Sequence, residues 1–222
     1  MFAVVRYNRY IKYEEGLELQ KKAYESVKED KFEGILLVLE HTPVFTTGSS
    51  GGVKNFLTSP EALAAEGIDV YETRRGGNVT FHGPGQIVAY PIFNLAKLKK
   101  DSHWFMDCIE STAIKTLAKY NLQARRKPEY RGVWVGDEKI TAIGIRIRKW
   151  ITMHGMALNV NVDKRYFAMI NPCGIKEFGV ASLEDFKPDV EIGDVKTELI
   201  RSFESVFNIE LHEAEENLLE VR

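Results

Sequence analysis

Hydrophobic and polar positions follow two different periods along the chain, and this pattern predicts a mixture of strands and helices. Apolar, strand-like runs cover residues 2–13, 34–40, 68–75, 87–95, 132–136, 139–150 and 151–162. Apolar residues at helical spacing mark residues 13–30, 59–67, 101–120 and 193–208. Because strands and helices do not alternate strictly, we predict an α+β fold with a central mixed β-sheet and flanking helices.

Several segments give sharper local expectations. Residues 34–40 form a continuous apolar run, which is typical of a buried strand. Residues 41–60 are rich in proline, glycine and serine, so we expect a loop there. The helix over 59–67 has Ser59 as its N-cap and ends at Gly67. The helix over 101–120 presents one apolar stripe, made of Phe105, Cys108, Ile109, Thr112, Thr116 and Tyr120.

Length and composition are those of an ordinary globular protein. The chain has 222 residues, of which 44% are hydrophobic, and its formal net charge is −2. A chain of this length buries enough apolar surface to fold without disulfides or structural metals, so we expect one catalytic domain over residues 1–222. The first residues lack a signal-peptide pattern, and no run approaches the roughly 20 apolar residues that cross a bilayer. We therefore expect a cytoplasmic protein with reduced thiols and no membrane association.

The charges are unevenly distributed. Residues 125–149 carry eight Lys or Arg against three Asp or Glu, whereas residues 177–222 carry four against thirteen. The global balance argues against a nucleic-acid partner. The basic stretch is either a solvated face or a docking surface for an acidic partner, with Arg146, Arg148 and Lys149 as the main contributors. The role of the acidic C-terminal segment stays open.

A glycine-rich stretch, RRGGNVTFHGPGQ at residues 74–86, separates two strand-like runs. Ordering glycines is entropically costly, so this stretch must need a close backbone approach. It matches neither phosphate-loop pattern, and His82 and His154 stand alone without metal-ligand spacing. We expect no metal and no cofactor. The remaining interpretation is a backbone-lined pocket wall in which His82 donates or accepts a hydrogen bond.

The two cysteines lie in contrasting contexts. Cys108 falls on the apolar stripe of its helix, which indicates a buried, inert thiol. Cys173 lies between a proline and a glycine in NPCGI, a context that would leave a thiol accessible. A reactive thiol needs a nearby cation to lower its pKa, and the candidates are Lys139, His82 and His154.

Three blocks, taken together, resemble the octanoyltransferases of lipoate biosynthesis. They are RGGNVTFHGPGQIVAYPI, EKITAIGIRIRKWITMHGMALNVNVD, and NPCGI followed by ASLEDF, in that order. The similarity runs from about residue 36 to about residue 186. It implies the α+β fold with a central mixed sheet that biotin and lipoate protein ligases share. Small departures are Ala181, where the family usually has Thr, and Asn78, where Gln, Asp or Lys is common.

The resemblance also implies roles for individual residues. Cys173 would carry an acyl thioester, and Lys139 would support it as the second catalytic residue. The residues implied to bind substrate are Arg75, Gly76, Gly77, Asn78, Val79, Thr80, Phe81, His82, Ala142, Ile143, Gly144, Gly155, Met156 and Ala157. Glycines 76, 77 and 83 would leave room for a thin alkyl chain. His82 would either stabilise an oxyanion or shape the pocket.

The implied reaction has two halves and needs no ATP. Cys173 attacks octanoyl-acyl carrier protein, and a lysine amine of the acceptor then attacks the octanoyl-enzyme. The implied acceptors are the lipoyl domains of 2-oxoacid dehydrogenase E2 subunits and the glycine cleavage H protein. Three alternatives remain: an ATP-dependent lipoate or biotin ligase, a non-catalytic module that binds the acylated carrier or a lipoyl domain, and a Cys–His hydrolase that releases free octanoate.

Overall fold

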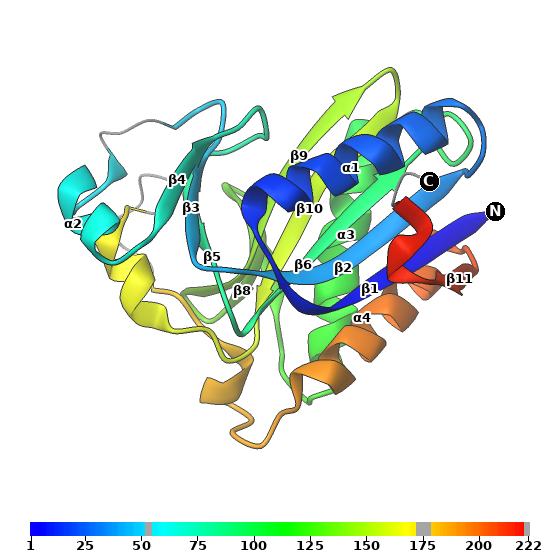
Figure 1. Cartoon of the computed structure of the whole chain (residues 1–222). Helices are drawn as coiled ribbons and strands as arrows, with labels where there is room; N and C mark the ends of the chain where they lie inside the picture. The colour runs from blue at the N-terminus through cyan, green and yellow to red at the C-terminus, as the bar shows by residue number, and fades with distance from the viewer. Residues whose placement is uncertain (52–54, 172–178, 220–222) are drawn as a thin grey trace.

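A large mixed β-sheet forms the centre of the molecule (Figure 1). The computed structural model describes residues 1–51, 55–171 and 179–219. The strand order of this sheet is β11-β1-β2-β6-β10-β9-β8-β7. The β1 strand pairs in parallel with β2 and β11, and the remaining neighbours are antiparallel. The predicted α+β fold with a central mixed sheet is therefore confirmed.

Two neighbouring inner strands, β2 and β6, explain why the sheet holds together. Every residue of β2 (Gly34–His41) and β6 (Gln86–Phe93) is buried, as expected for strands covered on both faces. Around them lie β1 (Phe2–Ile11), β9 (Glu138–Arg148), β10 (Ile151–Asn159), β8 (Tyr130–Val135), β7 (Arg125–Lys127) and β11 (Leu211–Ala214). The pattern analysis missed β7 and β11, which are short edge strands that carry mostly polar residues.

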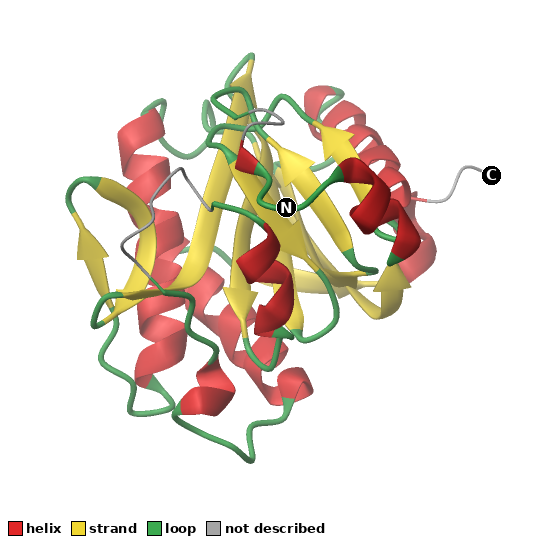
Figure 2. Ribbon diagram, turned by 90° about the vertical axis from the view of Figure 1, so that its left-hand side faces the viewer, coloured by secondary structure: helices red, strands yellow, loops and turns green. Residues whose placement is uncertain are grey.

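Helices cover both faces of this sheet (Figure 2). On one face lies α1 (Tyr13–Lys28), which buries Leu19, Ala23, Tyr24 and Val27 against it. On the other face α3 (Ser102–Ala118) and α4 (Ile192–Phe207) pack together over the main core. The predicted stripe of α3 is buried from Phe105 to Thr116, whereas Tyr120 lies beyond the helix end. Short 3-10 helices follow at η2 (Lys164–Met169), η4 (Leu183–Asp185) and η5 (Glu216–Leu219).

A second, three-stranded sheet lies beside the first, with the order β4-β3-β5 (Figure 1). It consists of β4 (Asp69–Glu72), β3 (Val44–Thr47) and β5 (Val79–His82), with α2 (Pro60–Ala65) next to it. Ser59 accepts a hydrogen bond from the Ala62 amide at 3.2 Å, so it starts this helix as predicted. Phe45, Val79 and Phe81 form a small core with the residues around η2.

The loop prediction at residues 41–60 was wrong in part, and the glycine-rich stretch at residues 74–86 also contains a strand. All four residues of β3 are buried within the first segment, and β5 occupies the middle of the second. Glycine, proline and serine around both strands hid these short runs, because a four-residue strand leaves little periodicity to detect. The glycine-rich stretch therefore contains a strand that faces the large sheet.

Candidate active site

A pocket opens between the small sheet and the α1-side face of the large sheet. Its floor comes from alternate residues of β6, namely Gln86, Val88 and Tyr90, because alternate strand residues share a face. The rest of the lining comes from several other elements. It consists of Tyr13, Arg75, Gly77, Asn78, Val79, Thr80, His82, Trp134, Lys139, Ala142, Ile143, Gly144, His154, Gly155, Met156, Ala157, Asn159, Phe167, Gly179 and Val180.

The arginine-glycine turn before β5 forms one wall. The buried Arg75 guanidinium donates to the Thr46 carbonyl at 2.7 Å and to the Asn78 carbonyl at 2.7 Å. Beside it, the Gly76 amide donates to the Ile145 carbonyl at 2.9 Å, which ties the turn to β9. A Cβ at Gly144 would lie 2.8 Å from the Gly76 carbonyl oxygen, so this crossing of two backbones requires glycine.

The Gly-Pro-Gly turn after β5 is held equally firmly. Gly85 has φ +82°, and a Cβ there would lie 2.4 Å from the Asn161 carbonyl oxygen. Its amide donates to the Glu40 carboxylate at 2.9 Å, and that carboxylate pairs with Lys196 at 2.9 Å. Both members of this ion pair are nearly buried. The turn is thereby fixed to β2 of the large sheet and to helix α4.

His82 lies on β5 with only 7% of its surface exposed. Its Nδ1 lies 2.8 Å from the Gln86 side-chain oxygen, and its ring stacks on Tyr13 with centroids 6.1 Å apart. Burial, together with the charges of His41 and Arg75, holds the His82 pKa well below its usual value. The imidazole is therefore neutral at neutral pH. Burial also raises the pKa of Tyr13 to about 12, which keeps that phenol protonated.

His154 lies in β10 where the pairing of this strand with β6 is interrupted, between the pairs Ile151–Asn94 and Met156–Ala89. Its φ is +59°, an unusual value for a residue that carries a side chain. Pro91 of the neighbouring β6 has no amide to donate, and a Cβ at Gly155 would lie 2.1 Å from the Ala89 carbonyl oxygen. The His154 amide therefore has no acceptor on β6 and donates instead to the side-chain oxygen of Gln20 in α1, at 2.8 Å. Burial lowers the pKa of the His154 imidazole to about 4, so this second pocket histidine is also neutral.

Lys139 lies at the start of β9, whereas His154 pairs with Ile145 further along the same strand. Its Nζ donates to the Arg131 carbonyl at 2.9 Å and lies 4.8 Å from the centre of the Trp134 ring. The Lys139 amide donates to Gly179, and the Ala181 amide donates back to Lys139. This pairing fixes the chain just after residues 172–178 to the lysine.

Only one of the two cysteines, Cys108, lies among the described residues. Cys173 lies outside the described residues. The residue that precedes that segment, Asn171, donates its amide to the Asn55 carbonyl at 2.8 Å. Cys108 is buried on α3, as predicted, and burial raises the pKa of its thiol to about 11. A thiol with that pKa carries almost no thiolate at neutral pH, so Cys108 is inert.

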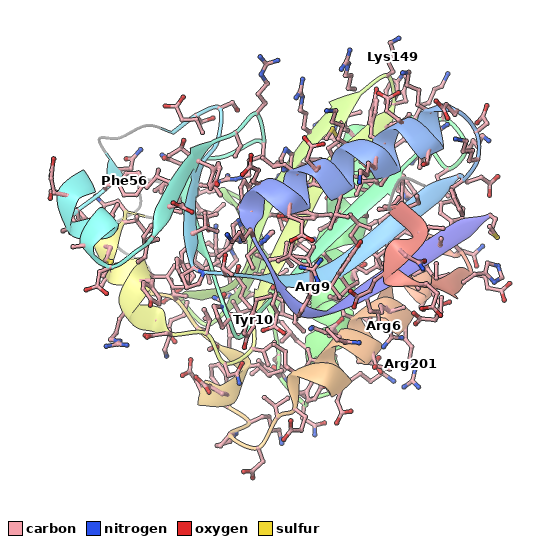
Figure 3. All side chains as sticks on the ribbon, in the orientation of Figure 1. Arg6, Arg9, Tyr10, Phe56, Lys149 and Arg201 are labelled. Carbon is pink, nitrogen blue, oxygen red and sulfur yellow. The ribbon has the colours of Figure 1, made fainter. Side chains whose placement is uncertain are left out.

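The basic stretch divides into two halves. In the first half, Arg126 pairs with Glu110 at 2.9 Å and Lys127 pairs with Asp137 at 2.7 Å. In the second half, Arg146, Arg148 and Lys149 form no ion pair with any described residue. Lys149 is at the outer tip of the β9–β10 hairpin and points away from the molecule (Figure 3). Arg74, which is exposed, lies on the turn that pairs with β9, and we refer to Arg74, Arg146, Arg148 and Lys149 together as the basic edge.

The structure brings together all the described residues that the sequence implied for substrate binding, except Gly76 and Phe81, which do not line the pocket. Phe81 points into the small core and stacks on Tyr166. The explanation proposed for Gly76 and Gly83 was wrong. Gly76 pairs with Ile145, and a Cβ at Gly83 would lie 2.5 Å from the Phe81 ring, so both positions serve close protein packing rather than a channel.

Sequence reasoning missed several pocket residues. Tyr13, Gln86, Tyr90 and Asn159 lie on elements whose apolar pattern reads as core, and nothing in that pattern sets them apart. His154 was singled out in the sequence only as a possible cation near a thiol, and not as part of the pocket wall. Among residues 1–51, 55–171 and 179–219, no three His, Cys, Asp or Glu side chains gather as a metal site. No helix in those ranges is long and apolar enough to cross a membrane.

The arrangement of two sheets around a pocket is that of a known protein family. Residues 12–204 match the family described as lipoyl protein ligase A/B catalytic domain, and the chain belongs to that family. Solved structures show the same fold. Lipoate-protein ligase A bound with ATP has a TM-score of 0.78 over 99% of this chain and 91% of that chain, at 19% identity. A putative lipoate protein ligase from T. acidophilum has a TM-score of 0.75 over 99% and 91%, at 18% identity.

Relatives at much higher identity locate the chain within the family. The octanoyltransferase of Clostridium kluyveri is 49% identical over 98% of this chain and 94% of its own length. That of Thermoanaerobacter pseudethanolicus is 52% identical over 91% and 89%. The protein is thus an enzyme of the octanoyltransferase group, which acts in protein lipoylation.

Proposed function

We propose that this octanoyltransferase moves an octanoyl group from octanoyl-acyl carrier protein to a lysine of lipoyl domains, through a thioester on Cys173. One observation carries the proposal: the backbone of Lys139 pairs with Gly179 and Ala181, directly after the segment that holds the cysteine. The lysine is thus close in space to the residues that follow the cysteine in the chain, which supports its proposed role as the cation for that thiol. Residues 1–222 act as one catalytic domain in this proposal.

The pocket suits an acyl chain joined to a polar reaction centre. Val88, Ile143, Met156 and Ala157 supply apolar surface, while Lys139, His82 and Asn159 supply polar groups. Each methylene buried there contributes about 0.8 kcal/mol, and overpacking beyond the pocket's end costs about 1–3 kcal/mol. Transfer should therefore be fastest near eight carbons, and kcat/KM should fall for longer chains. A steady rise from six to sixteen carbons would contradict a closed pocket.

Lys139 has two tasks in the proposed reaction. As a nearby cation it favours the Cys173 thiolate, and in the second half it relays a proton from the incoming amine to the departing sulfur. Lys139→Ala should shift the pH profile of Cys173 alkylation upward, because the thiolate loses a stabilising cation. An unshifted profile would remove Lys139 from this role.

Intact-mass measurement tests the central claim. After mixing with octanoyl-acyl carrier protein without ATP, the enzyme should gain one octanoyl group, and a lipoyl domain should then remove it. Cys173→Ser should lose the adduct, whereas the matched Cys108→Ser should keep it. An adduct on Cys108 would refute the assignment, as would transfer by Cys173→Ser at a normal rate. A requirement for ATP would instead favour a ligase.

The basic edge of Arg74, Arg146, Arg148 and Lys149 is the proposed docking surface for the acidic carrier. It borders the pocket through Arg146, whose charge adds to burial and to Arg75 in lowering the His154 pKa. Neutralising Arg148 and Lys149 should raise the KM for octanoyl carrier and flatten its salt dependence, with kcat little changed. Neutralising Arg125, whose guanidinium lies 4.0 Å from the Asp137 carboxylate, is the control. Equal effects of the two changes would contradict a docking role.

The proposed acceptors are the lipoyl domains of 2-oxoacid dehydrogenase E2 subunits and the glycine cleavage H protein. A solved relative of this fold comes from an archaeal lipoylation system with its E2 lipoyl domain, which supports that acceptor class. Isolated lipoyl domain and H protein, each offered to the octanoyl-enzyme, should both become octanoylated. Release of free octanoate alone would point to a hydrolase.

A further inference from the structure

The hydrogen bonds around His82 determine which ring nitrogen carries the proton. The chain of contacts starts at a backbone carbonyl: the Asn159 side-chain nitrogen lies 3.0 Å from the Ala181 oxygen. The Asn159 side-chain oxygen lies 2.9 Å from the Gln86 nitrogen, which also lies 3.2 Å from the Phe81 carbonyl oxygen. The Gln86 side-chain oxygen then lies 2.8 Å from His82 Nδ1.

Two backbone carbonyl groups determine which group donates and which accepts at each step of this series of hydrogen bonds. A backbone carbonyl only accepts, so Ala181 requires the Asn159 amide nitrogen on its side, and Phe81 requires the Gln86 nitrogen on its side. Reversing either side chain would set oxygen against oxygen. The Gln86 oxygen must therefore accept from His82, which puts the imidazole proton on Nδ1. In the neutral ring, Nε2 is then a bare acceptor.

This acceptor is open to the pocket. His82 lines the pocket, and its Nε2 forms no hydrogen bond with the described residues. The fully buried side-chain atoms without a partner among those residues include His154 Nδ1 but not His82 Nε2. A buried ring thus points one lone pair at whatever occupies the pocket. The low pKa of His82 keeps that lone pair available across the neutral range.

Only certain groups can use a bare acceptor. The acyl chain and its carbonyl carry no N–H or O–H, so the polar hydrogens of the reaction are on the thiol and on the attacking amine. Lys139 serves the thiol in the proposed function. We propose that His82 is the positioning residue for the attacking amine, whose N–H it accepts at Nε2. This inference rests on the proposed function.

The step balances with His82 as an acceptor throughout. The amine lone pair forms the N–C bond while the carbonyl pair moves to oxygen. When that pair returns, the C–S bond breaks and its electrons leave on the Cys173 sulfur. One amine proton passes to this sulfur through Lys139. The other, held by His82, stays on nitrogen as the N–H of the amide product. Because neutral His82 cannot donate from Nε2, it does not stabilise the oxyanion.

Nuclear magnetic resonance tests the tautomer directly. Long-range ¹H–¹⁵N spectra at neutral pH should show a protonated Nδ1 and an unprotonated Nε2 for His82. The protein has five histidines. The His82 signals are identified by their loss in His82→Asn, with exposed His103→Asn as the control. A proton on Nε2 would overturn the inference whatever the activity.

Rates of the two half-reactions test the role. In His82→Asn, the amide nitrogen can replace Nδ1 toward Gln86, but no atom remains at the Nε2 position. Acyl-enzyme formation should stay within about twofold, while transfer to the lipoyl domain should slow about 10- to 100-fold. His82→Gln, whose amide reaches the Nε2 position, should recover part of the transfer rate. Phe45→Leu perturbs the packing of the same small sheet and should leave the ratio of the two rates unchanged.

Each other outcome is decisive. If His82→Asn slows both halves equally, or slows only acyl-enzyme formation, His82 does not position the amine. An unchanged transfer rate would show the same. If the wild-type enzyme forms no acyl-enzyme at all, the proposed function fails and the amine assignment falls with it. The tautomer would still be read from the spectrum.

Discussion

The large sheet and the small sheet are stabilised in different ways. Strands β2 and β6 of the large sheet are buried throughout and lie between two apolar clusters, so burial of hydrocarbon dominates there. The small sheet has four-residue strands and one modest cluster. The pocket wall that the small sheet forms is held in place by hydrogen bonds of Arg75 and of two large-sheet residues, Gln86 and Asn159. Changes in the first region should cost stability, and changes in the second should cost activity.

The largest expected effect is in the core of the large sheet. Phe93 is fully buried and its ring contacts Phe2, Phe203 and Phe207. Phe93→Ala should lower the free energy of unfolding by about 3–5 kcal/mol, because it removes the ring and leaves a cavity. Urea unfolding measures this loss. The kcat of the fraction that remains folded should be unchanged. A specific loss of kcat would contradict the claim that changes in the large sheet cost stability rather than activity.

The Glu40–Lys196 ion pair holds the Gly85 turn, which follows β5 of the small sheet, so it should affect both properties. Glu40→Gln leaves the Lys196 charge buried without its partner, which should cost about 3–5 kcal/mol or slightly less with the amide nearby. The Gly85 turn should loosen as well, with a fall in kcat. The double variant Glu40→Gln/Lys196→Met should recover stability. If it recovers none, the unpaired charge is not the cause.

The third prediction concerns the loss of folding stability at low pH, to which His41 contributes. Burial lowers the pKa of His41 to about 4, well below the usual 6.5. The unfolded chain therefore binds a proton at higher pH than the folded one, so stability is lost as pH falls from about 6.5 towards 4. A tenfold difference in proton affinity between the folded and unfolded chain corresponds to about 1.4 kcal/mol of stability. His41→Gln should reduce this slope in urea unfolding between these pH values, whereas exposed His103→Gln should leave it intact.

The smallest effect is expected at Gly77 on the pocket wall. Its φ is +87°, but a Cβ would meet only the end of the Arg75 side chain, at 3.5 Å. Gly77→Ala should cost about 1 kcal/mol from backbone conformation alone. If the methyl also narrows the pocket, the preference should shift toward shorter acyl chains. Comparison of kcat/KM for hexanoyl, octanoyl and decanoyl carriers measures this shift, and an unchanged preference would place Gly77 outside the acyl site.

The sequence by itself determined the parts that depend on local periodicity and composition. The continuous apolar runs predicted β2 and β6, and the spacing of Phe105, Cys108 and Ile109 predicted α3 with its buried thiol. These predictions hold because burial of one face imposes a repeat that can be read along the chain. The three glycine-, lysine- and cysteine-containing blocks carried the family, which the comparisons confirm.

Only the tertiary structure decided which polar groups face one another. Gln86, Asn159 and Ala181 come from distant parts of the chain, and their hydrogen bonds set the His82 proton. Likewise, the charges of the basic stretch look alike in sequence, yet Arg126 is neutralised by Glu110 whereas Arg148 has no ion-pair partner among the described residues. A hydrogen bond or an ion pair depends on position within a few tenths of an ångström, and that position is fixed only when the sheets assemble.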